Sequence, residues 1–497
     1  MPASLPPNPN LEHLKKQAKL LLRAFRLNDP EAVKAFGTIS LRENPKLSDA
    51  QHVVARKYGF SSWPEIKAHV EAAAQISENV LQKARKAFRD DDAPTLRRIL
   101  EQYPALKASI NGPIEGLEGP PINSVRSPEM LDLLLDSGAD INARSNWWAG
   151  GFGLLDCATP EVAARAIERG AVVTVHAAAR LGMLEKLKEL IAEDPELVHA
   201  RGGDGQTPLH FASTVEVAEF LLERGADIDA RDVDHESTPA QYMVRTRQVV
   251  ARYLIGQGCT TDLLMAAALG DEDLTLKHLT ADPECIRMRV SDEYFPMVGG
   301  KSGGTIYQWE LGWYVSAPQV ARAFGHADLF DLLMERCPAD EQLLNACWMH
   351  DESMVHLLLV GNPDAAQSLP PSGRRHAAHA ARNDDTVAAR LMLESGLPVA
   401  SVFSQHHATP LHWAAWHGNA ELVRLILLRH PPLEDADNAY ESTPLGWALH
   451  GSENGWHRDR GDHPATVEAL LDAGVRPPEK LEGTDAVRAV LRRHGVR

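Results

Sequence analysis

The stretch TPLHWAAWHGNAELVRLILL, residues 409–428, decides the fold of this chain. Threonine followed by proline favours a helix start, because the Thr409 hydroxyl can cap the first turn and Pro410 fits its first position. Two paired alanines follow in this first helix, and residues 422–427 then repeat apolar side chains at helical spacing. The stretch therefore predicts a pair of short helices.

Related stretches recur along the chain. TPLHFAS begins at Thr207 and TPLGWALHG at Thr443, and each is followed by an apolar helix pattern that ends in glycine, as in LLERG and LLDAG. Weaker copies occupy residues 130–144, 175–191, 320–334 and 379–393. One helix pair cannot bury its apolar face alone, so neighbouring copies must stack on one another.

In these motifs, TPLH and LLxxGAD, the sequence resembles the ankyrin-repeat family, whose unit of about 33 residues is a hairpin finger followed by two antiparallel helices. The resemblance implies an all-α solenoid of about twelve units over residues 76–478. Residues 1–75 resemble the helical region ahead of bacterial ankyrin-like proteins, which implies a capping or docking domain. Within residues 479–497 we expect a polar capping helix over Thr484–His494.

The composition of the chain limits which partners and which cellular compartment we expect. The formal net charge of −17 argues against nucleic acid as a partner, since phosphate binding needs a Lys/Arg surface. Five scattered cysteines without a CxxC pair fit reduced thiols. The first ten residues lack a secretory-signal pattern, and no apolar run is long enough to span a membrane. We expect a soluble cytoplasmic protein that binds neither nucleic acid nor membrane.

One position of the repeat predicts a binding groove. Trp348, Arg382, Trp416 and His450 are each 34 residues apart and follow the small residues of the first helix, where side chains face the concave side, with His417 beside Trp416. Trp and Arg are enriched at binding hot spots, and an arginine between indoles can make cation–π contacts. The alternative is a partly solvated surface on which large side chains lean against their neighbours.

The position three residues earlier has a different interpretation. Trp413 and Trp447 occupy a slot usually given to a buried leucine, so we expect them in the core. The same slot holds His379 in the preceding repeat. The resemblance implies that His412 ties neighbouring repeats together by hydrogen bonds, and that His176 and His210 do the same.

Three insertions interrupt the repeats, at residues 146–153, 291–314 and 451–463. They hold five of the ten tryptophans, namely Trp147, Trp148, Trp309, Trp313 and Trp456. Glycine- and tryptophan-rich loops are not plain linkers, and functional residues concentrate on loops above a rigid scaffold. We therefore expect the first two insertions to fold over the groove and the third to close its C-terminal end.

Other sequence patterns give only weak indications of phosphate or metal binding. GGKSGG, residues 299–304, is not the GxxxxGK[ST] motif of a phosphate-binding loop. His376 and His379, the pair His406–His407, and His457 with His463 raise the question of a metal, but cysteine pairs and an HExxH helix are absent from the sequence. We expect no metal and no cofactor.

Two functions remain open. The first is a binding protein that holds a peptide or protein segment in the aromatic groove. The second is an enzyme, or a binder of a small polar or sugar-like ligand, that works by acid/base hydrolysis or elimination. Its candidate catalytic residues are Glu310, His450, His457 and Asp459, since a carboxyl group near indole rings can have a raised pKa and act as a general acid.

Overall fold

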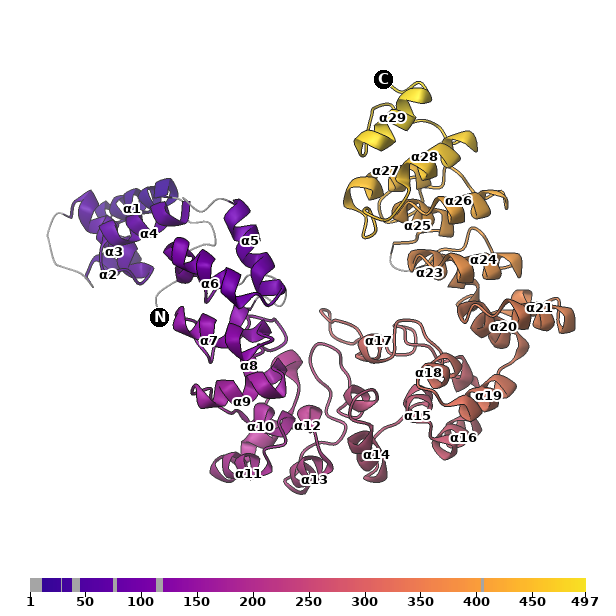
Figure 1. The fold of residues 1–497 in the computed structure, drawn as a ribbon, viewed down its shortest axis with the longest axis horizontal. Coiled ribbons are helices and arrows are strands. Elements are labelled where there is room, and N and C mark those ends of the chain that lie inside the picture. Colours follow the sequence, from indigo (N-terminus) through magenta and orange to yellow (C-terminus); the bar gives the residue numbers. More distant parts are fainter. Residues whose placement is uncertain (1–10, 28, 38–44, 75–77, 113–118, 404–405) are drawn as a thin grey trace. The chain divides into compact units, whose positions relative to one another are not determined.

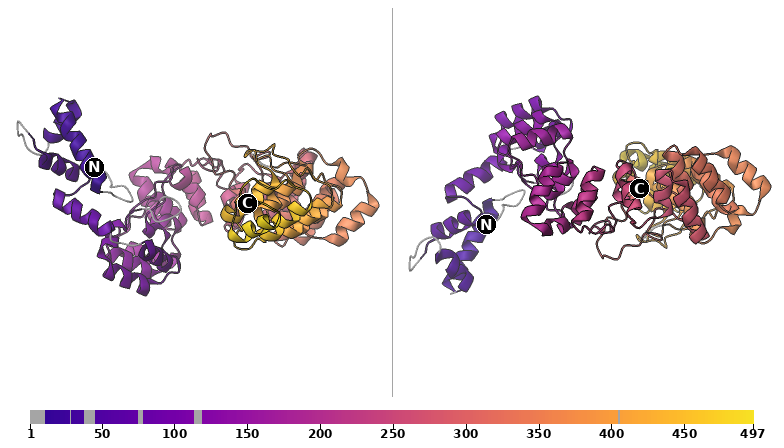
Figure 2. Two further views of the ribbon diagram at one scale, coloured as in Figure 1. Left: turned by 90° about the horizontal axis from the view of Figure 1, so that it is seen from above. Right: turned by 90° about the horizontal axis from the view of Figure 1, so that it is seen from below.

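The computed structural model describes the chain except residues 1–10, 28, 38–44, 75–77, 113–118 and 404–405 (Figure 1). The described residues divide into two compact units. Unit 1 comprises those of 1–260 and 297–306, and unit 2 those of 261–296 and 307–497. Helices joined by loops make up both units in every view (Figure 1, Figure 2), so the prediction of an all-α fold is confirmed.

Unit 1 begins with four helices that share a core of their own. Leu14, Phe36, Val54 and Ile66 are among the side chains buried in it. The helices are α1 (Leu11–Arg26), α2 (Pro30–Gly37), α3 (Leu47–Lys57) and α4 (Trp63–Ala74). That these residues form a separate capping or docking domain stays a prediction.

The rest of unit 1 consists of short helices separated by loops and 3-10 turns. The α-helices are α5 (Glu78–Arg89), α6 (Ala93–Gln102), α7 (Pro128–Asp136), α8 (Leu154–Cys157), α9 (Pro160–Glu168), α10 (Val175–Arg180), α11 (Leu184–Glu193), α12 (Pro208–Phe211), α13 (Val215–Glu223) and α14 (Gln248–Gly256). The 3-10 turns are η1 (Pro104–Ser109), η2 (Pro121–Ser124), η3 (Pro195–His199), η4 (Gly203–Gly205) and η5 (Gln241–Met243).

Unit 2 contains the more regular helix pairs. They are α15 (Leu263–Leu269), α16 (Glu272–Ala281), α17 (Tyr307–Glu310), α18 (Ala317–Ala323), α19 (Ala327–Arg336), α20 (Ala339–Trp348), α21 (Glu352–Gly361), α22 (Ala365–Ser368), α23 (His376–Arg382), α24 (Thr386–Glu394), α25 (Pro410–His417), α26 (Ala420–Leu427), α27 (Pro444–Asn454), α28 (His463–Asp472) and α29 (Asp485–Arg493), with η6 (Pro283–Arg287) and η7 (Gly373–Arg375). No described helix is long and apolar enough to cross a membrane.

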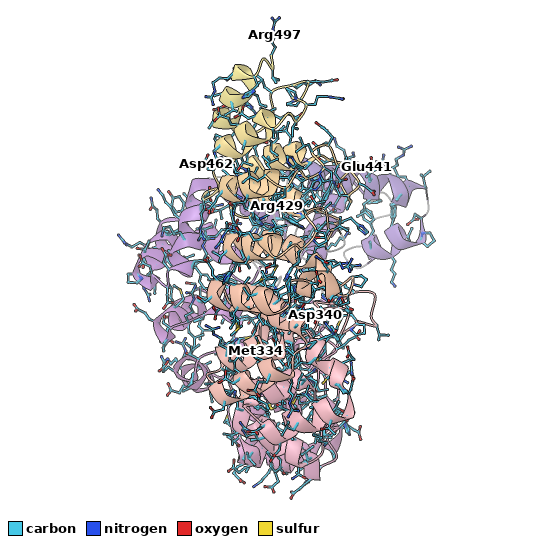
Figure 3. All side chains as sticks on the ribbon, turned by 90° about the vertical axis from the view of Figure 1, so that its right-hand side faces the viewer. Met334, Asp340, Arg429, Glu441, Asp462 and Arg497 are labelled. Carbon is cyan, nitrogen blue, oxygen red and sulfur yellow. The ribbon has the colours of Figure 1, made fainter. Side chains whose placement is uncertain are left out.

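Successive repeats of unit 2 stack through equivalent helices. The first helices α23, α25 and α27 pack on one another in order, and the second helices α24, α26 and α28 do the same. Figure 3 shows these helices in layers between Met334 and Asp462. One apolar core runs through the stack and includes Trp413 and Trp447, as predicted for that slot. The expected last helix is also present, as α29.

The helix starts follow from the Thr-Pro pairs. Thr409 is the N-cap of α25, and its hydroxyl lies 2.8 Å from Nδ1 of His412. Nε2 of His412 then donates to the carbonyl oxygens of Asp435 and Ser442 in the next finger, at 3.0 and 3.2 Å. His210 reaches the carbonyl of Ser237 in the same way. The predicted structural role of these histidines is confirmed.

The fingers are less regular than the hairpins that we expected. In the described part of the chain they contain isolated antiparallel bridges, for example Arg144 with Gly153 and Phe403 with Ala408, and no extended strands. The fingers are therefore loops held by a few hydrogen bonds.

Candidate functional site

Four indole rings gather around α25 and α27 in unit 2. The Trp416 ring lies 6.0 Å from that of Trp447 and 6.1 Å from that of Trp456, and the Trp413 ring stacks on Trp456 at 5.9 Å. Trp413 is 2% exposed, whereas Trp456 is 59% exposed. The exposed indole of Trp456 therefore packs on the buried indole of Trp413.

Glycines allow the third insertion to reach this position. A Cβ on Gly451 would lie 2.3 Å from the carbonyl oxygen of Trp416, and one on Gly455 would lie 2.5 Å from the carbonyl oxygen of Gly451. Heavy atoms cannot approach so closely, so only glycine lets the last turn of α27 and the start of the following loop lie against the end of α25. This contact places Trp456 over Trp413.

Arg382, at the end of α23, lies between two indoles. Its guanidinium carbon is 5.6 Å from the ring centres of both Trp413 and Trp456, within cation–π range. Among the described residues Arg382 forms no ion pair, and its Nε is buried without a hydrogen-bond partner. Burial lowers the pKa of this guanidinium, because low polarity disfavours the charged form.

Two imidazoles and a carboxylate lie beside this arginine. Nε2 of His417 donates to the carbonyl oxygen of Arg382 at 2.7 Å, and its ring stacks on His457 at 4.7 Å. Nδ1 of His457 is 3.1 Å from Oδ2 of Asp384, whose Oδ1 accepts from the Asn419 amide at 2.7 Å. Burial lowers the pKa of His417. The ligand atoms of this trio lie within 4.8 Å of one another, so it is one group able to hold a metal ion.

The backbone of Asp384 has a left-handed conformation, which costs free energy in a residue other than glycine. Asp384 has φ of 59°, and Gly418, 34 residues later, has φ of 68° at the equivalent helix end. Glycine adopts this left-handed conformation freely, whereas other residues adopt it with strain. Asp384 therefore stands where the next repeat has glycine, with its carboxylate directed at His457.

The predicted ladder needs correction at Trp348. The repeat spacing placed Arg382 between Trp348 and Trp416, but its cation–π partners are Trp413 and Trp456. Trp348 instead donates from its indole N–H to Nδ1 of His376 at 2.8 Å. Repeat spacing identifies which helix position a residue occupies, but rotamers and loops decide its partners. The neighbouring rung is present, with the rings of Trp416 and His450 5.7 Å apart.

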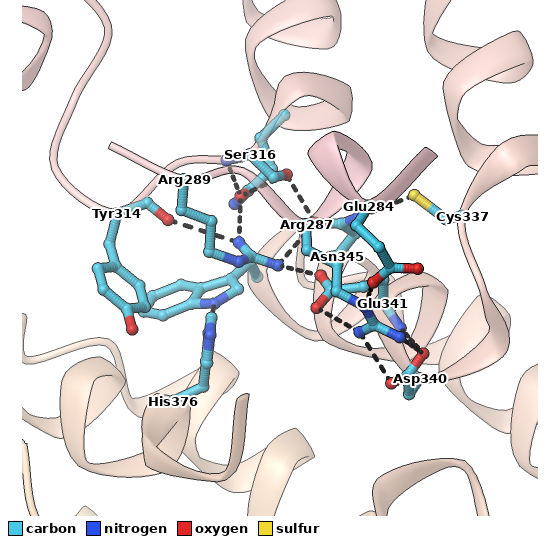
Figure 4. A network of polar contacts seen from close by, with 12 residues as sticks. Glu284, Arg287, Arg289, Tyr314, Ser316, Cys337, Asp340, Glu341, Asn345 and His376 are labelled. Carbon is cyan, nitrogen blue, oxygen red and sulfur yellow. Dashed lines mark hydrogen bonds and ion pairs between the residues drawn. The ribbon is translucent and has the colours of Figure 1, made fainter. Parts of the chain in front are cut away.

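Trp348 borders a buried polar network that the sequence did not predict. Arg289 is 4% exposed and donates to Glu341 Oε2 at 2.8 Å and to Asn345 Oδ1 at 3.3 Å. Figure 4 shows Arg287 and Arg289 facing Asp340 and Glu341. The sequence carried no motif for it, because the arginines and the acids lie more than fifty residues apart.

His376 and His379 are aromatic partners in this region. The Tyr314 ring lies 4.9 Å from that of His376 and 4.3 Å from that of His379, and Phe403 is 4.5 Å from His379. Both imidazoles are fully buried, and burial lowers their pKa far below the ordinary value. The two histidines, which are three residues apart on one helix, thus pack their rings against aromatic neighbours.

The tryptophans of the first two insertions lie in different surroundings. In unit 1, the rings of Trp147 and Trp148 are 6.4 Å apart, and the Lys301 ammonium lies 4.7 Å from the Trp148 ring centre. In unit 2, Trp309 is 69% exposed, and Trp313 packs against Tyr314 and its neighbours. That the first two insertions cover the groove stays a prediction.

The four catalytic candidates are spread over unit 2. Glu310 is the last residue of α17, Asp459 is exposed between α27 and α28, and His450 is exposed on α27. His457 contacts a carboxylate, that of Asp384, which was not among the candidates. The enzymatic alternative stays a prediction.

Comparison with known proteins identifies the repeats. The family described as "Ankyrin repeats (3 copies)" matches residues 175–264 and 343–438. The chain therefore contains ankyrin repeats. The second matched stretch contains α23 and α25, so Arg382 and Trp416 lie on ankyrin repeats, which are generally protein-interaction modules.

Individual relatives resemble only part of the chain. It is 31% identical over 117 residues to the "Ankyrin repeat and SAM domain-containing protein 6" of Mus musculus, and 29% identical over 131 residues to that of Rattus norvegicus. A 49-residue stretch is 51% identical to the "Serine/threonine-protein kinase VIK" of Arabidopsis thaliana. The matches to the mouse, rat and plant proteins cover 23%, 26% and 9% of this chain, and 13%, 15% and 11% of those relatives.

Proposed function

We propose that the chain binds a peptide or protein segment with an acidic side chain, at the surface formed by Arg382, Trp416, His450, Trp456 and His457. We call this surface the Arg382 site. The observation that carries the proposal is the Arg382 guanidinium, which lies between two indoles, has no ion pair among the described residues and has a buried Nε without a hydrogen-bond partner.

The chemistry of the site favours a carboxylate. A guanidinium presents several N–H donors in a fixed plane and binds carboxylates through paired, charge-assisted hydrogen bonds. Flanking rings exclude water from Arg382 and strengthen such bonds. The chain has a formal net charge of −17, so most of its surface should repel an acidic segment. The unpaired guanidinium of Arg382 offers such a segment a place to bind.

The aromatic side chains supply the apolar part of the contact. Trp456 is 59% exposed and stacks on the buried Trp413, so one face of its ring is available to a partner. Below it, Trp413 and Trp447 are buried and keep the exposed rings in place. A rigid aromatic base with an arginine is the composition typical of binding hot spots.

The test is selection of binders from a phage-displayed library of random peptides on the full chain. We expect the selected peptides to share an acidic residue beside an apolar one. They should bind Arg382→Met about 10- to 100-fold more weakly, which corresponds to the loss of a charge-assisted hydrogen bond, and Trp456→Ala at least 10-fold more weakly, which corresponds to the loss of an aromatic hot-spot contact. Arg424→Met, an exposed arginine on α26, is the matched control and should bind like the wild type. Selection of no peptide, or of peptides that bind Arg382→Met equally well, would refute the proposal.

A further inference from the structure

A second group of charged side chains lies in unit 1, where three loops meet. Asp204 belongs to η4, Asp234 and His235 belong to the following finger, and residues 297–306 of the second insertion pack beside them. Nε2 of His235 lies 3.8 Å from Oδ2 of Asp204 and 3.8 Å from Oδ2 of Asp234. His235 is 7% exposed and Asp234 is 4% exposed.

Backbone groups of the insertion orient two of these side chains. Nδ1 of His235 donates to the carbonyl oxygen of Gly304 at 2.6 Å, so in the neutral imidazole Nε2 carries the lone pair and faces both carboxylates. The Gly303 N–H donates to Oδ1 of Asp234 at 2.7 Å, which leaves Oδ2 facing the imidazole. Metal-binding histidines and carboxylates are held in this manner, by hydrogen bonds from their outer atoms.

Glycines make the approach of the loops possible. A Cβ on Gly303 would lie 2.9 Å from Cε1 of His235 and 3.0 Å from Oδ1 of Asp234, and one on Gly205 would lie 2.3 Å from the Val233 side chain. The GGKSGG sequence therefore brings backbone donors and acceptors against an Asp/His pair. In this structure it serves that contact instead of forming a phosphate-binding loop.

The negative charge of the group is not balanced by protein cations. In the described residues no lysine or arginine forms an ion pair with Asp204 or Asp234. A further carboxylate, that of Asp232, lies next to His235 in the same finger. Asp232 itself is hydrogen-bonded by the backbone of His235 and Ser237 and by the Tyr242 hydroxyl. Buried carboxylates are normally paired or bound to metal.

We propose that Asp204, Asp234 and His235 bind a divalent transition ion with the ligand preference of zinc. One imidazole nitrogen and two carboxylate oxygens are a donor set for Zn²⁺, and three protein ligands leave a fourth position for water. Ligands about 2.0–2.1 Å from a tetrahedral ion lie about 3.4 Å apart, so the observed separations of 3.8 Å need to close only slightly. The ion ties the second insertion to both fingers, and this role is independent of the Arg382 site.

Titration calorimetry of the full chain with ZnCl₂ tests the proposal. The wild type is expected to bind one Zn²⁺ ion more than Asp204→Asn or His235→Gln, or to bind it at least tenfold more tightly, the usual effect of losing part of a metal site. His199→Gln removes an exposed imidazole of the same unit and should leave Zn²⁺ binding unchanged.

Thermal unfolding separates loss of the site from loss of the fold. Without metal, Asp204→Asn should melt at a higher temperature than the wild type, because it removes one of two neighbouring carboxylates that no lysine or arginine of the described residues pairs. Zn²⁺ should then raise the melting temperature of the wild type and not that of the variant. Equal Zn²⁺ binding by wild type, Asp204→Asn and His235→Gln, no binding by the wild type, or binding of Ca²⁺ or Mg²⁺ in preference to Zn²⁺ would overturn the proposal.

Discussion

Mild acid is expected to destabilise unit 2 through two imidazoles that stay neutral in the folded chain. His376 and His379 are buried, and their burial lowers the pKa of both far below the ordinary value of 6.5, with the charge of Arg289 adding to the effect. In the folded chain Nδ1 of His376 accepts the indole N–H of Trp348, so a proton cannot be added there without breaking this bond.

The sign and size of the effect follow from proton linkage. Below pH 6.5 the unfolded chain binds protons that the folded chain does not, so this contribution to stability is complete above pH 6.5 and is lost as the pH falls. At pH 5.0, about 1.5 units below the ordinary pKa, each histidine that stays neutral in the folded chain destabilises it by about 2 kcal/mol.

The variant His379→Leu removes one of these contributions. Leucine is the residue usual for this slot, and the His379 ring lies among Tyr314, Phe403 and Trp348, with its Nδ1 buried and unpartnered. We therefore expect the variant to be about as stable as the wild type at pH 7.5. Between pH 7.5 and 5.0 it should lose about 2 kcal/mol less free energy of unfolding.

Urea unfolding followed by tryptophan fluorescence at both pH values measures this difference. Carboxylates titrate in both chains, so comparison of the two chains isolates the single histidine. His356→Leu, which removes an exposed imidazole from α21, should keep the pH dependence of the wild type. If His379→Leu lost as much stability as the wild type between these pH values, the account of a neutral buried imidazole would be wrong.

The remaining predictions concern the core and the polar network of unit 2. Trp413→Ala should lower the free energy of unfolding by about 3–5 kcal/mol, because it leaves a cavity where the buried indole was. Trp309→Ala, at a 69% exposed side chain, should change the free energy of unfolding by less than about 0.5 kcal/mol. Urea titrations of both variants measure these changes. Arg289→Met should lower the free energy of unfolding by about 1.5–3 kcal/mol, because the buried Oε2 of Glu341 loses its cation while Oε1 keeps Arg287 at 3.2 Å, and adding Glu341→Leu should restore much of the loss. A double variant no more stable than Arg289→Met would contradict this reading of the pair.

The stacked helices could be predicted because their information is local and repeated. Trp348, Arg382, Trp416 and His450 fall at the same place in successive repeats, and each lies in or directly at the end of a first helix. The burial of Trp413 followed from its slot in the same repeat. Such positions need only the helical period and the repeat length.

The partners of Arg382 could not be predicted in the same way. Its contact with Trp456 depends on the end of α27 and the following loop, which lie against α25 where Gly451 and Gly455 leave room, and no periodicity encodes that path. The Asp/His group of unit 1 was missed for a related reason. Asp204, His235 and Gly304 are far apart in the sequence and meet only after the fingers and the second insertion have packed.

The most direct test of the central claim is a double-mutant cycle between Arg382 and the acidic residue of a selected peptide. Binding is measured by calorimetry for wild type and Arg382→Met, each with the acidic peptide and with its amide counterpart. A direct charge contact predicts a coupling free energy of about 1.5 kcal/mol or more. A coupling near zero, with both changes acting independently, would show that the carboxylate does not bind at Arg382 and would contradict the proposed function.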